Sequence, residues 1–524
     1  MSSWRNSNEV QSKTQFWSLL SLAEDGASHS LSHSKDKENR PSTSPVVSPR
    51  STIRRQTKAN KNVSIPRFYF PSGRPSNQQN DVLLQRIAAV FQQLPGGHAT
   101  REQFGAVAKA CGCPLYWKVP LFMAARGEET GVVSLQSFLE FWQKLTNTHH
   151  DEASRFVHIL TTANPAAQRS YLIPEDFAPL IQDVVDTHPG LVFLKEASEF
   201  HSRYVHTIIA RIYYCVNRSW SGRITASEVR NSILLPTIRL LEEEEDINQI
   251  TDFFSYEHFY VIYCKFWELD KDHDLFIDKN DLARHNDRAI SSRMIDRIFS
   301  GAVKRGQSKE ESQKMSYAEF VWFLLAEEDK RHPTAIEYWF RCMDVDGDGY
   351  ISMYELEYFY EEQLQRMEAL GIETLPFEDC LCQMLDMVNP AIPGKISLRD
   401  LKQCRMTPIF FDTFFNLEKY LDHEQRDPFA SQRDLTSDNG QEMSDWDRYA
   451  AEEYELLVAE EGGNDPSDDM FCEEEMDADD EMPATLGLDN PLPMNMPCKL
   501  QSPLYPTARS ESPMASSNPD FVMY

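Results

Sequence analysis

The sequence lacks several patterns that would mark an enzyme, a membrane protein or a zinc protein. None of its 10 cysteines forms a CxxC pair and its 14 histidines are dispersed, so neither a zinc site nor a disulfide framework is predicted. No run approaches the roughly 20 apolar residues that span a bilayer, and the N-terminus has no apolar signal core. A glycine-rich phosphate loop, a GxSxG turn and an HExxH helix are also missing. We therefore expect a non-catalytic chain with no membrane contact, in the cytoplasm or the nucleus.

Positive charge is scarce over most of the chain. The 524 residues carry 52 Lys and Arg against 82 Asp and Glu, a net charge of −30, and this argues against nucleic-acid binding through a basic face. The balance is uneven, because residues 1–75 hold twelve basic and five acidic side chains, whereas residues 460–481 hold twelve acidic and no basic ones. The hydrophobic share of 41% is ample for a core, and the length predicts two or three folded units.

The densest cluster of potential ligands is DVDGDGYISMYE, residues 344–355. In a twelve-residue EF-hand loop the calcium ligands stand at positions 1, 3, 5, 7, 9 and 12, and position 6 is glycine. Gly349 stands at the sixth position, and Ile351 at the eighth can pair with a partner loop through a short bridge. The six ligand positions are filled by Asp344, Asp346, Asp348, Tyr350, Ser352 and Glu355. Apolar residues keep helical spacing on both sides, so the sequence predicts a calcium site between two helices.

A second loop of this kind is DKDHDLFIDKND, residues 270–281. Its ligand positions hold Asp270, Asp272, Asp274, Phe276 through its carbonyl oxygen, Asp278 and Asp281. Leu275 stands where glycine is usual, and a left-handed conformation there costs roughly 1–2 kcal/mol. Asp281 is one methylene shorter than the usual glutamate and is expected to reach an ion through one oxygen. Five carboxylates still favour a bound cation, Ca²⁺, at this loop.

Other segments keep the loop scaffold without its ligands. Residues 217–228 and 389–400 retain Gly222 and Gly394 at the sixth position and isoleucine at the eighth, but they have lost most carboxylates. Both predict degenerate EF-hands that bind little or no metal. A further pair of degenerate EF-hands is indicated within residues 81–145. The sequence thus predicts an all-α fold, an elongated array of EF-hand and degenerate EF-hand helix pairs.

The predicted organisation has six parts. Residues 1–64 and 461–524 have compositions typical of disordered segments, a basic arm and an acidic tail. We expect an N-terminal helical region at 65–200, which includes an extended aromatic docking segment, IPRFYFP, at 65–71. Two EF-hand domains follow at 201–328 and 329–425, with the metal loops 270–281 and 344–355. A C-terminal docking segment is predicted at 426–460.

Longer stretches resemble the B-double-prime regulatory subunits of protein phosphatase 2A. The likeness covers about residues 65–461. It is carried by IPRFYFPSGRP, DKDHDLFID, DVDGDGYISMYELEYFYEEQ, PFEDCLCQMLDMV, GKISLRDLKQCRM, FFDTFFNLEKYLDHEQRDPFA and DWDRYAAEEYELLVAEE. The resemblance implies a non-catalytic subunit that docks on the helical-repeat scaffold subunit and the catalytic subunit, and that selects phosphoserine and phosphothreonine substrates. It also implies that Ca²⁺ at the two loops stiffens the subunit and strengthens assembly.

Two other functions are weighed against this one. The first is an EF-hand calcium sensor or structural protein of the centrosome or cytoskeleton without a phosphatase, and the centrosome is accordingly a further candidate location. The second, a metal-dependent hydrolase, is disfavoured because an ion saturates EF-hand carboxylates and leaves little room for substrate.

Short motifs in the basic arm suggest regulation. Residues 37–39 spell KEN, a tripeptide typical of ubiquitin-ligase degrons, and Ser44 and Ser48 each precede proline, as proline-directed kinases require. Basic residues within 54–61 are compatible with a weak nuclear-import patch, although a solvated arm is the simpler interpretation. In the body, the adjacent His149 and His150 are interpreted as a solvated pair.

Overall fold

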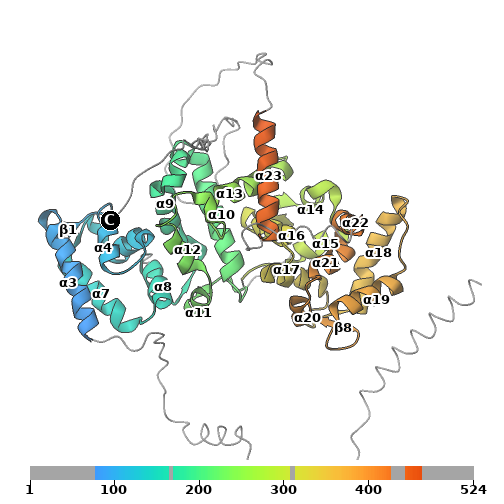
Figure 1. Ribbon diagram of the computed structural model, residues 1–524, viewed down its shortest axis with the longest axis horizontal. Coiled ribbons are helices and arrows are strands. Elements are labelled where there is room, and N and C mark those ends of the chain that lie inside the picture. The colour runs from blue at the N-terminus through green and yellow to red at the C-terminus, as the bar shows by residue number, and fades with distance from the viewer. Residues whose placement is uncertain (1–76, 164–168, 307–312, 426–442, 463–524) are drawn as a thin grey trace, which may run out of the picture. The chain divides into compact units, whose positions relative to one another are not determined.

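Helices make up most of the part of the chain that the structure describes. The computed structural model describes residues 77–163, 169–306, 313–425 and 443–462 (Figure 1). These residues belong to one unit, Tyr69–Tyr524, and they confirm the predicted all-α class. Across these ranges, none of the helices has both the length and the apolar character that crossing a bilayer requires. The segment at 65–71, the motifs of the basic arm and the acidic run from 463 lie outside the described residues.

Within the described ranges, the main elements are α-helices and eight short strands. The helices are α3 (Asn77–Gln93), α4 (Phe104–Ala110), α5 (Lys118–Ala124), α6 (Gly127–Thr130), α7 (Leu135–Thr148), α8 (Glu152–Ala163), α9 (Ala178–Thr187), α10 (Ser198–Val216), α11 (Ala226–Arg230), α12 (Leu234–Leu240), α13 (Tyr256–Leu269), α14 (Lys279–Leu282), α15 (Ser292–Arg297), α16 (Tyr317–Glu328), α17 (Pro333–Met343), α18 (Met353–Ala369), α19 (Phe377–Val388), α20 (Leu398–Gln403), α21 (Thr407–Phe415), α22 (Leu417–Gln425) and α23 (Asp445–Gly462). The strands are β1 (His98–Ala99), β2 (Val133–Ser134), β3 (Tyr171–Leu172), β4 (Ile224–Thr225), β5 (Ile277–Asp278), β6 (Lys314–Met315), β7 (Tyr350–Ser352) and β8 (Lys395–Ser397).

Short 3₁₀- or π-type helical segments fill several connections between these elements. They are η1 (Pro95–Gly97), η2 (Leu115–Trp117), η3 (Pro174–Phe177), η4 (Pro189–Glu196), η5 (Ile247–Gln249), η6 (His285–Arg288) and the π-type turn η7 (Ile298–Ala302).

Four two-stranded antiparallel sheets arrange the described helices as four pairs of helix–loop–helix units. The sheets are β1–β2, β3–β4, β5–β6 and β7–β8. The predicted bridge at Ile351 is confirmed, because this residue pairs with Ile396, and both side chains are fully buried. Ile277 pairs in the same way with Met315. Each sheet thus joins two loops, as neighbouring EF-hands do.

One hydrogen bond recurs in most of these loops and identifies them as one repeated structure. The N–H group at loop position nine donates to the side chain at position twelve, three residues later. The pairs are Thr100 with Gln103, Ile173 with Asp176, Thr225 with Glu228, Asp278 with Asp281, Ser316 with Glu319, Ser352 with Glu355 and Ser397 with Asp400. The bond caps the first turn of the outgoing helix. The segments that end at Asp176 and Glu319 lack a ligand pattern, but their described residues share this bond with the ends of the other EF-hand loops.

The strands join different loops than the predicted domains suggest. β4 lies in the degenerate loop 217–228 and pairs with β3, whereas β5 of the loop 270–281 pairs with β6. The predicted boundary at residue 200 therefore falls between the two halves of the second pair.

The apolar stripes around the metal loops form the cores of the last two pairs. On α17, Trp339 and Met343 are fully buried, and the Trp339 ring lies 4.5 Å from the Phe415 ring of α21. On α13, Phe259 and Ile262 are fully buried. Burying one such side chain stabilises the fold by about 1.5–3 kcal/mol, so packing positions the loop ends.

The third and fourth pairs are joined by contacts that end at a metal loop. Arg297 of α15 donates to the carbonyl oxygens of Cys342 and Asp344, at 2.8 and 3.0 Å, and so caps the C-terminal end of α17. A buried ionic network lies nearby, in which Lys330 contacts Glu327 at 2.6 Å and Asp412 at 3.0 Å. Lys419 of α22 lies 3.1 Å from Glu327. The helices that hold the two metal loops therefore share one packed body.

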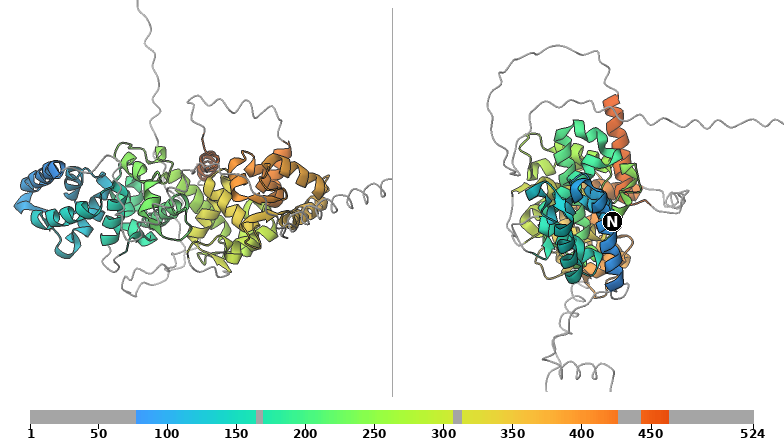
Figure 2. Two further views of the ribbon diagram at one scale, coloured as in Figure 1. Left: turned by 90° about the horizontal axis from the view of Figure 1, so that it is seen from below. Right: turned by 90° about the vertical axis from the view of Figure 1, so that its left-hand side faces the viewer.

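The C-terminal helix α23 packs against α13 and α16, beside which it is labelled in Figure 1. Figure 2 shows it, in orange to brown, at the outer edge of the helical body. Trp446 is almost fully buried and donates from its indole nitrogen to Nδ1 of His258, at 3.1 Å. Lys265 and Glu453 form an ion pair at 2.9 Å. The chain end thus covers the helix that leads into the loop 270–281.

Candidate metal-binding loops

The loop 344–355 brings three predicted ligands together. Asp344, Asp346 and Glu355 each offer a carboxylate oxygen, and these oxygens lie within 4.8 Å of one another. Asp344 holds the turn by accepting the N–H groups of Gly347 and Gly349, at 2.8 and 3.0 Å. Burial raises the pKa of Asp344 above its ordinary value, and the charges of Glu355 and Asp348 raise it further. The crowding of negative charge is what a bound divalent cation would relieve.

The remaining predicted ligands of this loop lie beside the cluster. Asp348 accepts the N–H of Tyr350 at 2.8 Å through one oxygen, and its other oxygen lies 3.4 Å from Nζ of Lys395. Ser352 donates from its hydroxyl to Glu355 at 2.9 Å. Tyr350 lies on β7, where its carbonyl oxygen is the predicted ligand.

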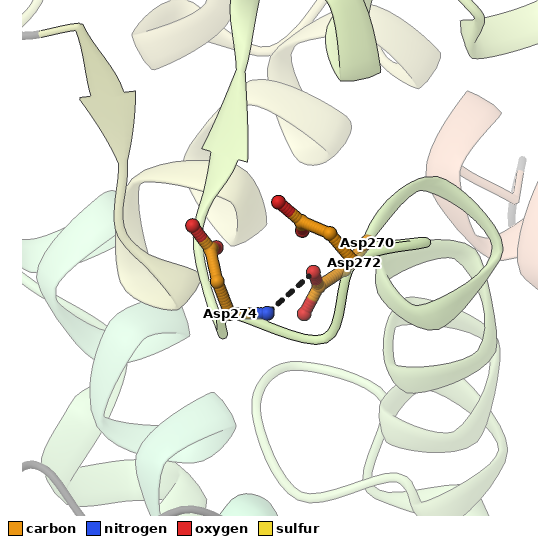
Figure 3. Close-up of side chains that lie close together, drawn as sticks. All are labelled: Asp270, Asp272 and Asp274. Atoms are coloured by element: carbon orange, nitrogen blue, oxygen red, sulfur yellow. Dashed lines mark hydrogen bonds between the residues drawn. The ribbon is translucent and has the colours of Figure 1, made fainter.

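The loop 270–281 gathers the first three of its predicted ligands. The carboxylates of Asp270, Asp272 and Asp274 surround the interior of the turn (Figure 3), with one oxygen of each within 4.8 Å of the others. Asp270 is fully buried and accepts the N–H groups of Asp274 and Leu275, at 3.2 and 3.0 Å. Burial raises its pKa, and the neighbouring carboxylates of Asp272 and Asp274 act in the same direction.

The structure separates the other two carboxylates from this cluster. Asp278 accepts the N–H groups of Asn280 and Asp281, at 2.7 and 2.8 Å. Burial raises the pKa of Asp278, but these hydrogen bonds outweigh it and the pKa is lowered. Asp281 forms an ion pair with Arg284 at 2.6 Å through one oxygen and accepts the N–H of Asp278 at 2.9 Å through the other. The loop is therefore less complete than 344–355, where the twelfth position joins the cluster. Phe276 precedes β5, and its carbonyl oxygen remains the predicted seventh-position ligand.

Backbone geometry confirms the strain expected at Leu275. Its φ is 68°, matching φ of 86° at Gly349 in the equivalent position, and His273 has φ of 56° where Gly347 has 77°. Residues with a Cβ rarely adopt this left-handed conformation. The loop 270–281 therefore takes the EF-hand turn against the preference of its own residues.

The degenerate loop 217–228 has a side-chain amide in place of a cation. Nδ2 of Asn217 lies 3.1 and 3.4 Å from the hydroxyls of Ser219 and Ser221, 3.0 Å from the carbonyl oxygen of Arg223 and 3.2 Å from Oε1 of Glu228. These atoms come from loop positions 3, 5, 7 and 12, the positions that ligate calcium in an EF-hand. Asn217 is fully buried, and its Oδ1 accepts the N–H of Gly222 at 2.9 Å. The N–H donors of an amide thus close this loop without metal.

The loop 389–400 keeps only the last carboxylate. Asp400 accepts the hydroxyl and the N–H of Ser397, at 2.6 and 2.9 Å, and a single bridge joins Ile392 to Lys395. This geometry agrees with the prediction that 389–400 is a degenerate EF-hand loop, which pairs with the loop 344–355.

The donor chemistry of both acidic loops fits a hard divalent cation. Ca²⁺ takes six to eight oxygen ligands at 2.3–2.6 Å, mainly from carboxylates, carbonyls and water. Each loop supplies three carboxylate oxygens around one space. The first-position aspartates, the buried Asp270 and the half-buried Asp344, have raised pKa values because their charges are partly desolvated and crowded. No other group of three or more such side chains was found within the described ranges.

Sequence patterns missed several residues that shape these loops. Lys314 and Lys395, on β6 and β8, contact Asp274 and Asp348, but their own loops carry no ligand pattern. Of the adjacent His149 and His150, His150 is exposed, and His149 is half-buried and stacks on His158 with 4.3 Å between ring centroids.

The sequence matches three protein families, all of EF-hand type. Residues 86–145 match the family described as "P2R3B, EF-hand", residues 151–244 match "EF-hand domain", and residues 259–361 match "EF-hand domain pair". The last match includes both acidic loops, whereas in the structure each acidic loop pairs with a degenerate one.

Curated relatives cover most of the chain. Over 409 residues, the chain is 62% identical to the human B'' beta regulatory subunit of serine/threonine-protein phosphatase 2A, covering 78% of the chain and 70% of the relative. It is 58% identical to the mouse B'' delta counterpart over 78% of the chain and 82% of the relative. Its identity to the human B'' alpha counterpart is also 62%, but it spans only 38% of that protein's length.

A solved structure is also similar. It is a PP2A PR70 holoenzyme in which one chain has 70% sequence identity to this protein, at a TM-score of 0.49. The similarity covers 52% of this chain and 100% of that one.

Proposed function

The chain belongs to the B'' family of protein phosphatase 2A regulatory subunits, and from this premise we propose that it binds Ca²⁺ at two loops and docks on the scaffold and catalytic subunits of the phosphatase. In this role it directs the holoenzyme to phosphoserine and phosphothreonine substrates. Its relatives are named as regulatory subunits, not catalytic ones. The observation that carries the proposal is the pair of carboxylate clusters, each within 4.8 Å, in a chain that is 62% identical to such a regulatory protein.

The ligands proposed for each ion follow the loop positions. In the loop 344–355, Asp344, Asp346 and Glu355 form the cluster, and Asp348, Tyr350 and Ser352 complete the set. In the loop 270–281, Asp270, Asp272 and Asp274 form the cluster, and Phe276, Asp278 and Asp281 complete it. Bound Ca²⁺ would supply positive charge that neutralises these carboxylates. We expect tighter binding at 344–355, because Glu355 already faces the cluster whereas Asp281 is paired with Arg284.

The packing around the loops supports a role for Ca²⁺ in shape and assembly. α13 ends at the first ligand of one loop and also contacts α10, α16 and α23. α17 ends at the first ligand of the other loop and is capped by Arg297 from the neighbouring pair. Ordering either loop therefore restrains helices that belong to the shared body. A protein that is ordered before it docks loses less conformational entropy on binding.

Family membership favours this function over a calcium-binding protein of the centrosome or cytoskeleton that has no phosphatase. For location, we propose the cytoplasm or the nucleus, with the centrosome as a third candidate. The cysteines of the described residues are free thiols, as is usual in a reducing compartment. Imaging of a fluorescent fusion would test the location.

Reconstitution tests the function. The full chain is mixed with purified scaffold and catalytic subunits, with calcium or with a chelator, and passed over a size-exclusion column. We expect a stoichiometric three-part complex that is tighter with calcium. The matched control is the Asp272→Ala, Asp346→Ala variant, which should assemble equally with and without calcium. Failure to form the complex at micromolar concentrations with calcium present would refute the proposal.

A second measurement addresses substrate choice. The catalytic and scaffold subunits, with and without the chain, are incubated with a phosphorylated cell extract, and phosphosites are quantified. The chain should accelerate loss of phosphate at a subset of serine and threonine sites. A uniform change at all sites would contradict a role in substrate selection.

A further inference from the structure

Each acidic loop faces a lysine from its partner strand. Lys314 of β6 lies opposite Asp278, the ninth position of the loop 270–281. Lys395 of β8 lies opposite Ser352, the ninth position of the loop 344–355. The two lysines therefore occupy the same place in two EF-hand pairs that differ in sequence.

The two lysines also make the same contacts. Lys314 forms an ion pair with Asp274, and Nζ of Lys395 lies 3.4 Å from Oδ2 of Asp348. Both aspartates stand at the fifth loop position. Each ammonium also lies over the aromatic ring at the seventh position, 5.6 Å from the centroid of Phe276 and 5.5 Å from that of Tyr350. The aromatic ring and the carboxylate together hold the lysine ammonium group at one place.

We propose that Lys314 and Lys395 lower the calcium affinity of their loops by placing a fixed positive charge on the fifth-position aspartate. The inference rests on the proposed binding of Ca²⁺ to these loops and extends it to residues outside the ligand set. Without metal, the ammonium neutralises part of the carboxylate charge and stabilises the empty loop. With metal, the ammonium lies close to a dication and repels it. Both effects weaken binding.

The expected size follows from the charges and their exposure. A unit charge about 7 Å from a dication changes binding roughly three- to tenfold when water screens most of the field. The lysine side chains are 54% and 49% exposed, so the effect must shrink at high salt. Exposed ion pairs usually contribute little to folding stability, but here the carboxylate is a proposed ligand, so its pairing alters the binding equilibrium directly.

Charge-changing substitutions in the full chain test the inference. Calcium chloride is titrated calorimetrically into variants at Lys395, in a background where Asp270→Ala and Asp272→Ala silence the other loop. Variants at Lys314 are measured with Asp344→Ala and Glu355→Ala. Lys→Met should tighten binding roughly three- to tenfold, and Lys→Arg should leave it near wild type. The gain should fall in 1 M potassium chloride. Lys402→Met is the matched control, because Lys402 is 34% exposed and pairs with Glu337, which is not a ligand.

Thermal unfolding supplies a second readout. In a chelator, Lys→Met should lower the melting temperature, because the loop carboxylates lose their counter-charge. In saturating calcium, the same variant should gain more stability than wild type does. A larger gain with calcium is not expected if the lysines only pack against the aromatic rings.

The outcomes separate this inference from the proposed function. If wild type binds calcium and Lys→Met binds with unchanged or weaker affinity at both loops, the role of the lysines is wrong while calcium binding stands. If wild type binds no calcium at either loop, the proposed sites are wrong and the inference falls with them.

Discussion

The side-chain amide of Asn217 donates a hydrogen bond to Oε1 of Glu228, at 3.2 Å, across the interior of the loop 217–228. The same nitrogen contacts the oxygens of Ser219, Ser221 and Arg223. The amide thus stands among the atoms that would surround an ion, and it makes this loop independent of metal.

Replacing this amide with a carboxylate should make the stability of the loop depend on calcium. Asn217→Asp removes the donor and places a second carboxylate beside Glu228 in a fully buried position, which should cost about 1–3 kcal/mol of folding free energy in a chelator. Millimolar calcium should restore part of this loss. Asn217→Ala, the control, should lose stability in the same way but regain none with calcium. Equal melting temperatures for wild type and Asn217→Asp in the chelator would contradict the interpretation that the amide takes the place of a cation.

Removing the most complete acidic loop should leave one calcium-binding event. Asp344→Ala with Glu355→Ala deletes two of the three clustered carboxylates, and calorimetric titration should then show at most one remaining event, from residues 270–281. Glu361→Ala with Glu362→Ala is the control for charge, since these residues lie on α18 and contact Arg293 and Ser292 instead of the loop. Unchanged stoichiometry in the double variant would mean that the site is misplaced.

Glycine at position 275 should stabilise the protein. Leu275 has φ of 68°, a conformation that costs a residue with a Cβ roughly 1–2 kcal/mol, while glycine loses up to about 1 kcal/mol through greater freedom of the unfolded chain. Leu275→Gly should therefore raise the unfolding free energy by about 0.5–1 kcal/mol, measured in a chelator by thermal or urea denaturation. Gly349→Leu, the reciprocal change at φ of 86°, should destabilise. A stability loss in Leu275→Gly would show that packing of the leucine side chain outweighs the strain.

Trp446 should hold α23 on α13. The indole is 5% exposed, and it lies against the ring of His258 with 5.6 Å between centroids. Trp446→Ala should weaken this contact by about 3–5 kcal/mol and release the helix, so that amide hydrogens in residues 445–460 exchange faster. Leu456→Ala on the same helix, where the leucine is 59% exposed, should leave exchange unchanged. Equal exchange in both variants would mean that other contacts suffice to hold α23.

Asp329 should make stability rise as the pH falls. Burial, together with the nearby charge of Asp445 on α23, raises its pKa to about 6. Because the folded state then holds the proton more tightly than the unfolded state, wild type gains stability as the pH falls through 6 toward the ordinary value near 4. Asp329→Asn lacks this dependence and should be more stable than wild type at pH 8, by about 1–2 kcal/mol.

The measurement is the difference in unfolding free energy between the two proteins at pH 8 and at pH 5. Burial lowers the pKa of the neighbouring His332 to about 4, which has the opposite pH dependence, but this histidine is present in both proteins and its contribution cancels in the difference. A difference that does not vary with pH would contradict a titrating Asp329.

The sequence by itself determined the residues that form each loop. EF-hand ligands lie within twelve consecutive residues, so the two acidic loops, the degenerate loops at 217–228 and 389–400 and the apolar stripes of α13 and α17 could all be read locally. The all-α class followed from the same periodicity. The six ligand positions of each acidic loop remain predictions, of which three per loop are gathered within 4.8 Å.

Only the tertiary structure decided which loops pair and what fills them. Ile277 pairs with Met315 in a loop that kept no ligand pattern, so nothing local could identify the partner. The ammonium groups of Lys314 and Lys395 and the cover of α13 by α23 depend on contacts between residues that are 40 to 188 positions apart. The amide of Asn217 lies within one loop, but its place among the ligand-position oxygens is visible only in the folded turn. The spacing of the ligands within a loop is a property of the local sequence. The lysine that faces a loop and the loop that pairs with it are determined by the packing of distant segments. The sequence therefore located the acidic loops, and the fold assigned each one its partner.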